Sequence, residues 1–213
     1  MTGGTRTITV SGHGSASGVP DLLTLSIGVE CRREDVAAAY RAAGELSAAM
    51  SAALRQHGVA GPDIGTSGLN VRADVVWQEG RGQVVAGYFA STMLKVFVRD
   101  LAASARIIAS AVEAGGNDVR LNGLELGFAD ASEVSRRARE AAWQDAATAA
   151  AQFAALAGQE LGPVISVTQQ PQNAGPIPVP VLERAMASQP LAVEAGESSV
   201  HAAVTVVWEL RSP

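Results

Sequence analysis

The residues of this chain that could carry chemistry are few, and the most conspicuous is His13, in a glycine-rich stretch at residues 11–18. A phosphate-binding loop needs a helix directly after its glycines, so that the helix N–H groups face the anion. Here Val19 and Pro20 lead into a strand-like pattern, and Ala16 occupies the nucleophile position of a Gly-x-Ser-x-Gly elbow. We therefore interpret residues 11–18 as a connection between strands and retain His13 only as a weak candidate for binding a small ligand.

The other histidines and the single cysteine form no recognisable site. His57 and His201 lack the spacing of helical metal ligands, and no carboxylate is placed as in His-Glu-x-x-His. Cys31 excludes an intrachain disulfide and a cysteine-based zinc site, and its place on an apolar strand face predicts a small buried hydrophobe rather than a reactive thiol. A catalytic triad assembled only in space stays open as the alternative. We expect no catalytic residue, no metal site and no cofactor.

Arginines and tryptophans are the remaining side chains that could recognise a ligand. Arg136, Arg137 and Arg139 form a basic cluster, which we interpret as a solvated helix face, with contact to an acidic partner as the alternative. The faces of the strands that carry Trp77 and Trp208 look buried, and Trp143 lies on a helix pattern. Core packing or a subunit contact explains all three tryptophans more simply than ligand stacking.

Two periodicities divide the chain into strands and helices. Alternation of apolar and polar residues predicts strands over 23–31, 69–78, 84–99 and 200–211, with shorter candidates over 5–11, 120–128 and 164–168. Apolar residues three and four positions apart predict helices over 34–57, 100–116 and 132–157. The resulting order, ββαββαβαββ, favours an α+β fold in which three helices pack on largely antiparallel sheets.

Two of these elements carry further expectations. The helix over 132–157 is mostly alanine inside, and since alanine lets backbones approach closely, this helix should lie near a sheet or a partner helix. The long strand over 84–99 has edges that must be paired or covered, so we expect a subunit interface along it.

Length and charge bound the class of protein. The 213 residues suit a single domain over 1–213, with a division into two lobes, about 1–116 and 117–213, as a variant. The net charge of −5 gives no overall field that favours nucleic acid. No apolar run reaches the ~18–20 residues of a transmembrane helix, so we expect no transmembrane segment.

The proline-rich stretch at 171–190 is interpreted as a disordered segment or an interface rather than a lid.

The first residues show no basic segment followed by an apolar one, so no secretory signal is recognisable. As written, the sequence predicts a cytoplasmic protein. A chain from which a leader had been removed would look the same and would be periplasmic or extracellular.

Short motifs follow one another along the chain in a fixed order. They are ITVSGHG at 8–14, VPD at 19–21, GYFA at 87–90, VRDL at 98–101, AGGNDV at 114–119, LGPVISV at 161–167 and WEL at 208–210. Over nearly the whole chain this order resembles the SIMPL-domain family, which includes bacterial periplasmic immunogenic proteins and oxidative-stress defence proteins.

The resemblance implies a non-enzymatic, oligomer-forming protein with a stress-related or envelope-related role, because the family brings no catalytic residues to carry over. A protein-binding module in signalling that uses residues 171–190 as its contact is the alternative, followed by a small-ligand binder. The homo-oligomer and a protein partner are therefore the expected associations. The missing leader is the departure from most bacterial members.

Residues that match the family signature are interpreted as structural; they are Pro20, Asp21, Gly87, Tyr88, Gly162 and Pro163. Pro20 should help to set where the next strand begins, and Asp21 should accept hydrogen bonds from backbone N–H groups at that turn. Gly87 should allow a bulge or close packing beside Tyr88.

Overall fold

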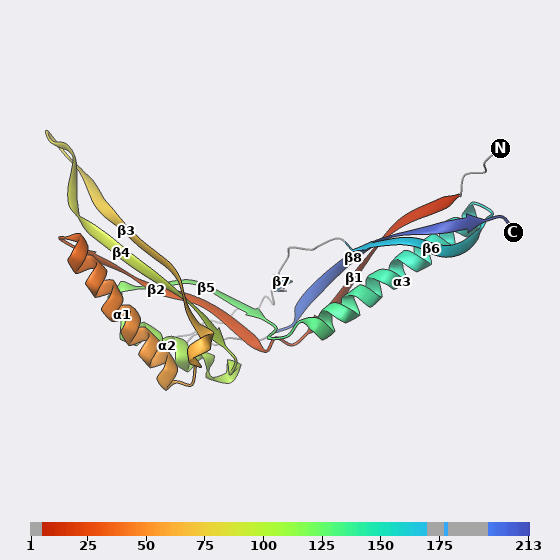
Figure 1. Ribbon diagram of the computed structural model, residues 1–213. Coiled ribbons are helices and arrows are strands. Elements are labelled where there is room, and N and C mark those ends of the chain that lie inside the picture. Colours follow the sequence, from red (N-terminus) through yellow and green to blue (C-terminus); the bar gives the residue numbers. More distant parts are fainter. Residues whose placement is uncertain (1–5, 170–176, 179–195) are drawn as a thin grey trace, which may run out of the picture. The chain divides into compact units, whose positions relative to one another are not determined.

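The computed structural model describes residues 6–169, 177–178 and 196–213 (Figure 1). These residues form two compact units. The terminal unit comprises the described residues of Met1–Pro20, Asp130–Leu182 and Gly196–Pro213, and the central unit those of Asp21–Ala129. Across the described residues, α-helices pack on antiparallel sheets, which confirms the expected α+β class.

The terminal unit is a sheet with one helix along it. Its strands pair antiparallel in the order β1 (Thr7–Gly18), β8 (Ser198–Arg211) and β6 (Glu160–Gln169), and the short β7 (Ile177–Pro178) pairs with the first residues of β8. Helix α3 (Ser132–Leu156) packs against β1 and β8 on one face of this sheet (Figure 1). Val206 and Trp208 of β8 are buried in the resulting core.

Small residues bring the helix and β1 together. The buried residues of α3 lie four positions apart and, after Val134, are all alanine: Ala138, Ala142, Ala146, Ala150 and Ala154. Gly12 and Gly14 of β1 face this row, and a β-carbon on either glycine would overlap the backbone of Ala142. The expectation that the alanine-rich helix lies close to a sheet is confirmed.

Residues 11–18 are not the connection that the sequence suggested, because β1 continues to Gly18. Along this half of the strand Gly12 and Gly14 point toward α3, whereas Ser11, His13 and Ser15 are exposed. Glycine usually weakens a strand. Here it is required, since the helix backbone occupies the space that a side chain would fill.

The central unit is a second antiparallel sheet with two helices on one face. The strand order is β3 (Ile64–Gln78), β4 (Gly82–Val98), β2 (Leu22–Arg33) and β5 (Val119–Gly127). Helices α1 (Val36–Gln56) and α2 (Ser104–Gly115) cover β2 and β4, with single 3-10 turns at Gly61–Asp63, Leu101–Ala103 and Gly116–Asp118. The alternating residues Leu23, Leu25 and Ile27 form one core with Met50 and Leu54.

Local signals fix where these helices begin. The Asp35 carboxylate accepts a hydrogen bond from the Ala38 N–H (2.8 Å) and so caps α1. The Asp100 carboxylate accepts from the Ala103 N–H (3.1 Å), and the predicted helix therefore starts with a 3-10 turn before α2.

The long strand along which we expect a subunit interface is an interior strand, and its edges are paired within the chain over most of its length. β4 pairs with β3 on one side and with β2 on the other, so a partner cannot add to its edges over most of its length. Within the described part of the central unit, the edge strands are β3 and β5. A subunit interface along residues 88–98 therefore cannot use strand addition.

The two compact units do not follow the lobes 1–116 and 117–213. β5 lies in the central unit because it pairs with β2, and β1 lies in the terminal unit because it pairs with β8. Apart from β7, the proline-rich stretch at 171–190 lies outside the described residues. Within those residues, no helix is both long enough and apolar enough to cross a membrane.

Candidate functional site

His13 lies on the exposed face of β1, opposite Ala203 of β8. Its backbone N–H donates to Oδ2 of Asp145 on α3 (2.9 Å), which ties the strand to the helix through the main chain of His13 rather than its imidazole. On the same face of the sheet, His201 lies opposite Ser15. Among the described residues neither imidazole has a carboxylate at ion-pair distance, and no group of three or more His, Cys, Asp or Glu is arranged to hold a metal ion.

Cys31 lies fully buried at the end of β2, as its strand pattern predicted. Burial and the neighbouring Asp118 carboxylate raise the pKa of its thiol from 9.0 to about 11. A thiolate is the reactive form of cysteine. At neutral pH this side chain is therefore an inert part of the core.

The signature pair Pro20 and Asp21 lies immediately before β2. Pro20 is buried, and Asp21 is exposed. Oδ1 of Asp21 accepts a hydrogen bond from the Ala129 N–H (2.7 Å), and the Asp21 N–H donates to the Gly127 carbonyl (3.0 Å). Asp21 thus closes the end of the β2–β5 ladder through residues more than a hundred positions away.

The second signature pair, Gly87 and Tyr88, lies beside a β-bulge. The β3–β4 register shifts between Asp74 and Val75, so that Ala86 has no partner on β3. A β-carbon on Gly87 would come within 2.8 Å of the Arg33 carbonyl oxygen. Arg32 holds the bulge from β2, since its guanidinium donates to the Ala86 carbonyl (2.9 Å) and to Asp74 (2.6 Å).

The third signature pair, Gly162 and Pro163, lies in an irregularity of the edge strand β6. The register with β8 jumps between Leu161 and Val164, which leaves both residues outside the regular ladder. A β-carbon on Gly162 would meet the Glu209 carbonyl oxygen at 2.9 Å. Proline lacks an N–H donor and is tolerated at such a bulge.

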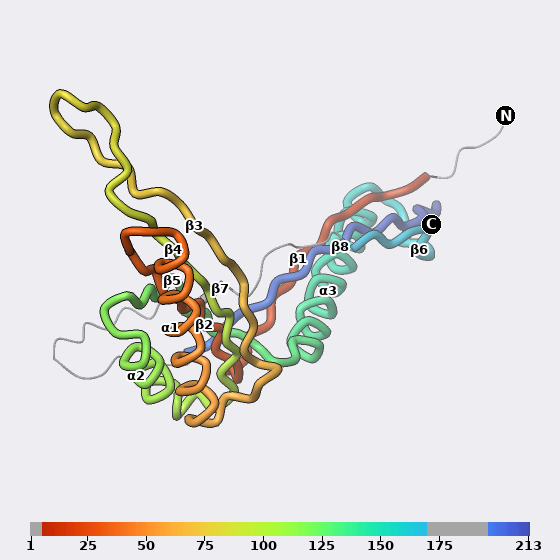
Figure 2. The backbone as a smooth tube through the Cα atoms, turned by 60° about the vertical axis from the view of Figure 1, so that its left-hand side comes forward, coloured from red at the N-terminus to blue at the C-terminus, as the bar shows by residue number. Residues whose placement is uncertain are grey.

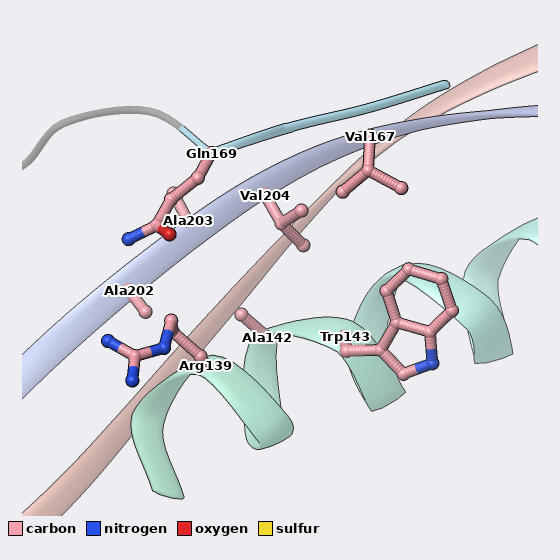
Figure 3. Close-up of a pocket in the computed structure, with 8 residues that line it drawn as sticks. All are labelled: Arg139, Ala142, Trp143, Val167, Gln169, Ala202, Ala203 and Val204. Atoms are coloured by element: carbon pink, nitrogen blue, oxygen red, sulfur yellow. The ribbon is translucent and has the colours of Figure 1, made fainter. Parts of the chain in front are cut away.

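The basic cluster of α3 is divided among three environments. Arg136 forms ion pairs with Glu133 (2.6 Å) and Glu140 on the helix surface. Arg137 donates to the Ser17 carbonyl of β1 (2.7 Å). Arg139 lies at a cavity between α3 and the strands β6 and β8 (Figure 3). All three arginines are exposed, as the interpretation as a solvated helix face predicts, and they differ in what their guanidinium groups contact.

An uncovered apolar surface follows the edge strand β3. We call it the hairpin row, and it consists of Leu69, Val71, Val75 and Trp77 of β3 with Val85 of β4, all of them exposed. Val71 lies opposite Ala90, which is buried in the core, so the row points to the helix-covered side of the sheet. The helices cover β2 and β4 instead, and leave the row open.

The end of the hairpin extends past the sheet that supports it. β2 pairs with β4 only as far as Tyr88, so residues 74–87 form a two-stranded ribbon. This ribbon projects beyond the rest of the central unit and carries Val75, Trp77 and Val85 (Figures 1 and 2). Trp77 is 77% exposed, whereas Trp208 is 4% exposed, so the expectation of a buried face is correct for Trp208 and wrong for Trp77.

Similarity to known proteins covers most of the chain. The family model "SIMPL: Protein of unknown function (DUF541)" matches residues 8–208. Uncharacterized protein YggE of Escherichia coli strain K12 is 32% identical over 197 residues, which are 92% of this chain and 78% of that protein. The 26 kDa periplasmic immunogenic protein of Brucella melitensis biotype 1 is 28% identical over 215 residues, covering 96% of this chain and 84% of the relative. The protein of the same name from Brucella abortus strain S19 is 27% identical.

Proposed function

The chain belongs to the SIMPL (DUF541) family, and from this premise we propose that it is a non-enzymatic bacterial protein that works as an assembly of identical subunits, with a stress-related or envelope-related role. The observation that carries the proposal is the hairpin row, an apolar surface that the rest of the described chain leaves uncovered.

A second copy of the chain is the partner that suits this surface. Within the described residues, β3 pairs with β4 on one side and with no strand on the other, which is the arrangement that strand addition uses. The row lies on the same strand, so one partner can pair with the edge and cover the apolar side chains. Exposed aromatic and aliphatic groups on a projecting ribbon are typical of a contact between proteins.

The surroundings of His13 and Cys31, the side chains best suited to catalysis, support a non-enzymatic role. The imidazole of His13 is on an exposed strand face, and the thiol of Cys31 is buried and protonated at neutral pH. The signature residues are placed at ladder ends and bulges, where they shape the backbone.

The envelope location is supported by the name of the Brucella relatives, which are periplasmic. Release of the native gene product by osmotic shock, with a cytoplasmic marker enzyme retained, is the expected result. Retention with the marker would favour the cytoplasmic location instead.

Assembly is tested by light scattering of the purified protein over a range of concentrations. We expect a mass that is a multiple of the 21.8 kDa of one chain. The double variant Val75→Ser, Trp77→Ser removes two apolar side chains of the hairpin row and should shift the protein toward the monomer. Since both side chains are exposed, folding should be unaffected.

The matched control is the double variant Phe153→Ser, Leu156→Ser, which removes two exposed apolar side chains from α3. It should keep the mass of the unmodified protein. If the unmodified chain is a monomer at high concentration, the proposed assembly is wrong. If both double variants lower the measured mass of the assembly equally, the hairpin row is not the assembly surface.

A further inference from the structure

The terminal unit contains a cavity that none of the signature residues and none of the hairpin row lines. Its volume is about 190 Å³, and it lies where α3, packed mainly on β1 and β8, leaves the edge strand β6 partly uncovered. Trp143 and Arg139 approach it from α3, Val167 and Gln169 from β6, and Ala202 and Val204 from β8 (Figure 3).

The walls of the cavity are apolar. Val167 lies opposite Val206, and Gln169 opposite Val204, so both residues of β6 are on the helix-facing side of the sheet. The floor is formed by the short side chains of Ala142 and Ala202, which is why there is room between helix and sheet. The indole ring of Trp143 lines the cavity and contacts that of Trp208, with ring centroids 6.2 Å apart.

One end of the cavity is polar. The guanidinium of Arg139 and the amide of Gln169 lie at the same end, away from the Trp143 ring (Figure 3). Neither group makes a side-chain hydrogen bond or an ion pair within the described part of the chain, in contrast to Arg136 and Arg137 of the same helix turn. A guanidinium beside an amide N–H₂ presents several donors to one acceptor, which is the pattern that binds a carboxylate.

Size limits what can bind. Sites for drug-sized ligands have volumes of roughly 300 Å³ or more. A volume of about 190 Å³ suits a single ring with a short substituent. A flat ring suits it because Trp143 lines the cavity with an aromatic ring, against which a planar body can stack or pack edge to face.

We propose that this cavity binds a small aromatic monocarboxylate, with the carboxylate on Arg139 and Gln169 and the ring against Trp143. The site is independent of self-assembly, since its residues belong to the terminal unit and the hairpin row to the central unit. It is also distinct from His13, which is not among the residues that line it.

The test is isothermal titration calorimetry of the full chain with phenylacetate, phenylacetamide and acetate. Phenylacetate should bind at one site per chain with a Kd below about 1 mM, a value within reach of roughly ten non-hydrogen atoms. Phenylacetamide has the ring without the charge and acetate the charge without the ring, so each should bind at least about tenfold more weakly.

Variants locate the site. Arg139→Gln should weaken phenylacetate binding at least about tenfold, because it removes the charged donor. Arg136→Gln changes the net charge of the same helix equally and should leave binding unchanged. Val167→Trp fills the cavity from an exposed position and should abolish binding. If Arg139→Gln lacks the circular dichroism of the folded chain, Gln169→Leu takes its place with the same expectation in direction.

Three results would overturn the proposal. They are the absence of saturable heat with phenylacetate, equal affinity for phenylacetate and phenylacetamide, and equal loss of binding in Arg136→Gln and Arg139→Gln. A monomeric protein that binds phenylacetate would leave this site standing while removing the assembly, so the two proposals fail separately.

Discussion

Gly12 lies so close to Ala142 that a β-carbon on the glycine would overlap the carbonyl oxygen of the alanine. This approach joins β1 to α3 at the middle of the terminal unit, and the Asp145 contact with the His13 N–H continues it one residue further along the strand. The histidine in the glycine-rich motif thus lies between two positions that are determined by packing. The motif is conspicuous in sequence because the helix requires it.

Gly12→Ala is therefore expected to destabilise the terminal unit by about 3 kcal/mol, the cost of forcing extra volume into a packed core. The nearest atoms to a β-carbon on Gly12 are backbone atoms of Ala142 and Ala146, so α3 and β1 would have to move apart to admit it. Urea unfolding followed by circular dichroism and by tryptophan fluorescence measures the change.

Gly44→Ala is the matched control. Gly44 is on the exposed side of α1 with open space where a β-carbon would stand. Since alanine favours a helix over glycine, this variant should gain about 0.5–1 kcal/mol. A loss of stability at Gly44, or none at Gly12, would contradict the packing described for these two positions.

Most of the fold could be predicted from periodicity. Alternation locates β2 and β8, three- and four-residue spacing locates the helices, and the carboxylates of Asp35 and Asp100 mark helix starts. These signals are local. The extension of β1 through Gly14 to Gly18 could not be predicted, because glycine is a strand breaker unless a distant backbone needs its space.

The candidate surfaces were harder to foresee for the same reason. Alternation shows that Val75 and Trp77 share a face, but only the tertiary arrangement shows that none of the described helices covers it. The cavity combines Arg139 of α3 with Gln169 of β6. The sequence identifies Arg139 only as a member of the basic cluster, and nothing in it distinguishes the environment of Arg139 from that of Arg136.

Asp21→Ala should lower the free energy of unfolding of the central unit by about 1 kcal/mol, the net value of one hydrogen bond. The variant removes the acceptor of the Ala129 N–H at the end of the β2–β5 ladder. Asp21→Asn retains a side-chain oxygen and should recover most of the loss. If Asp21→Asn is as unstable as Asp21→Ala, Asp21 contributes through its charge rather than through the hydrogen bond. Chemical denaturation of both variants distinguishes the two outcomes.

The raised pKa of the Cys31 thiol predicts that the stability of the protein falls at alkaline pH. Burial and Asp118 raise the pKa of its thiol to about 11, so the folded state favours the neutral form. Below pH 9, the ordinary pKa of the thiol, Cys31 is neutral in both states and its contribution to stability is fully present. As pH rises from 9 toward 11 the thiol ionises more readily in the unfolded chain, so the free energy of unfolding falls. Between pH 8 and 11 the loss amounts to about 2 kcal/mol.

Other groups also titrate in this range, so the quantity to measure is the difference in unfolding free energy between the unmodified protein and Cys31→Ala. That difference should shrink as pH rises from 9 to 11. A thiol-specific reagent added to the folded protein at pH 7 should react only at the rate of unfolding. Rapid labelling, or a difference that is constant with pH, would show that the thiol is accessible.

The two tryptophans on strands provide the sharpest contrast in stability. Trp208 is buried beneath α3 beside Trp143, and Trp208→Ala should cost about 3–5 kcal/mol through loss of burial and the cavity left behind. Trp77→Ala removes a side chain that is 77% exposed and should change the unfolding free energy by less than about 0.5 kcal/mol in dilute protein. At higher concentration the Trp77 variant should lose stability relative to the unmodified chain, because assembly stabilises only the protein that can assemble. A large cost of Trp77→Ala in dilute protein would mean that the ribbon packs on its own chain, and the hairpin row would no longer be a surface for a second copy.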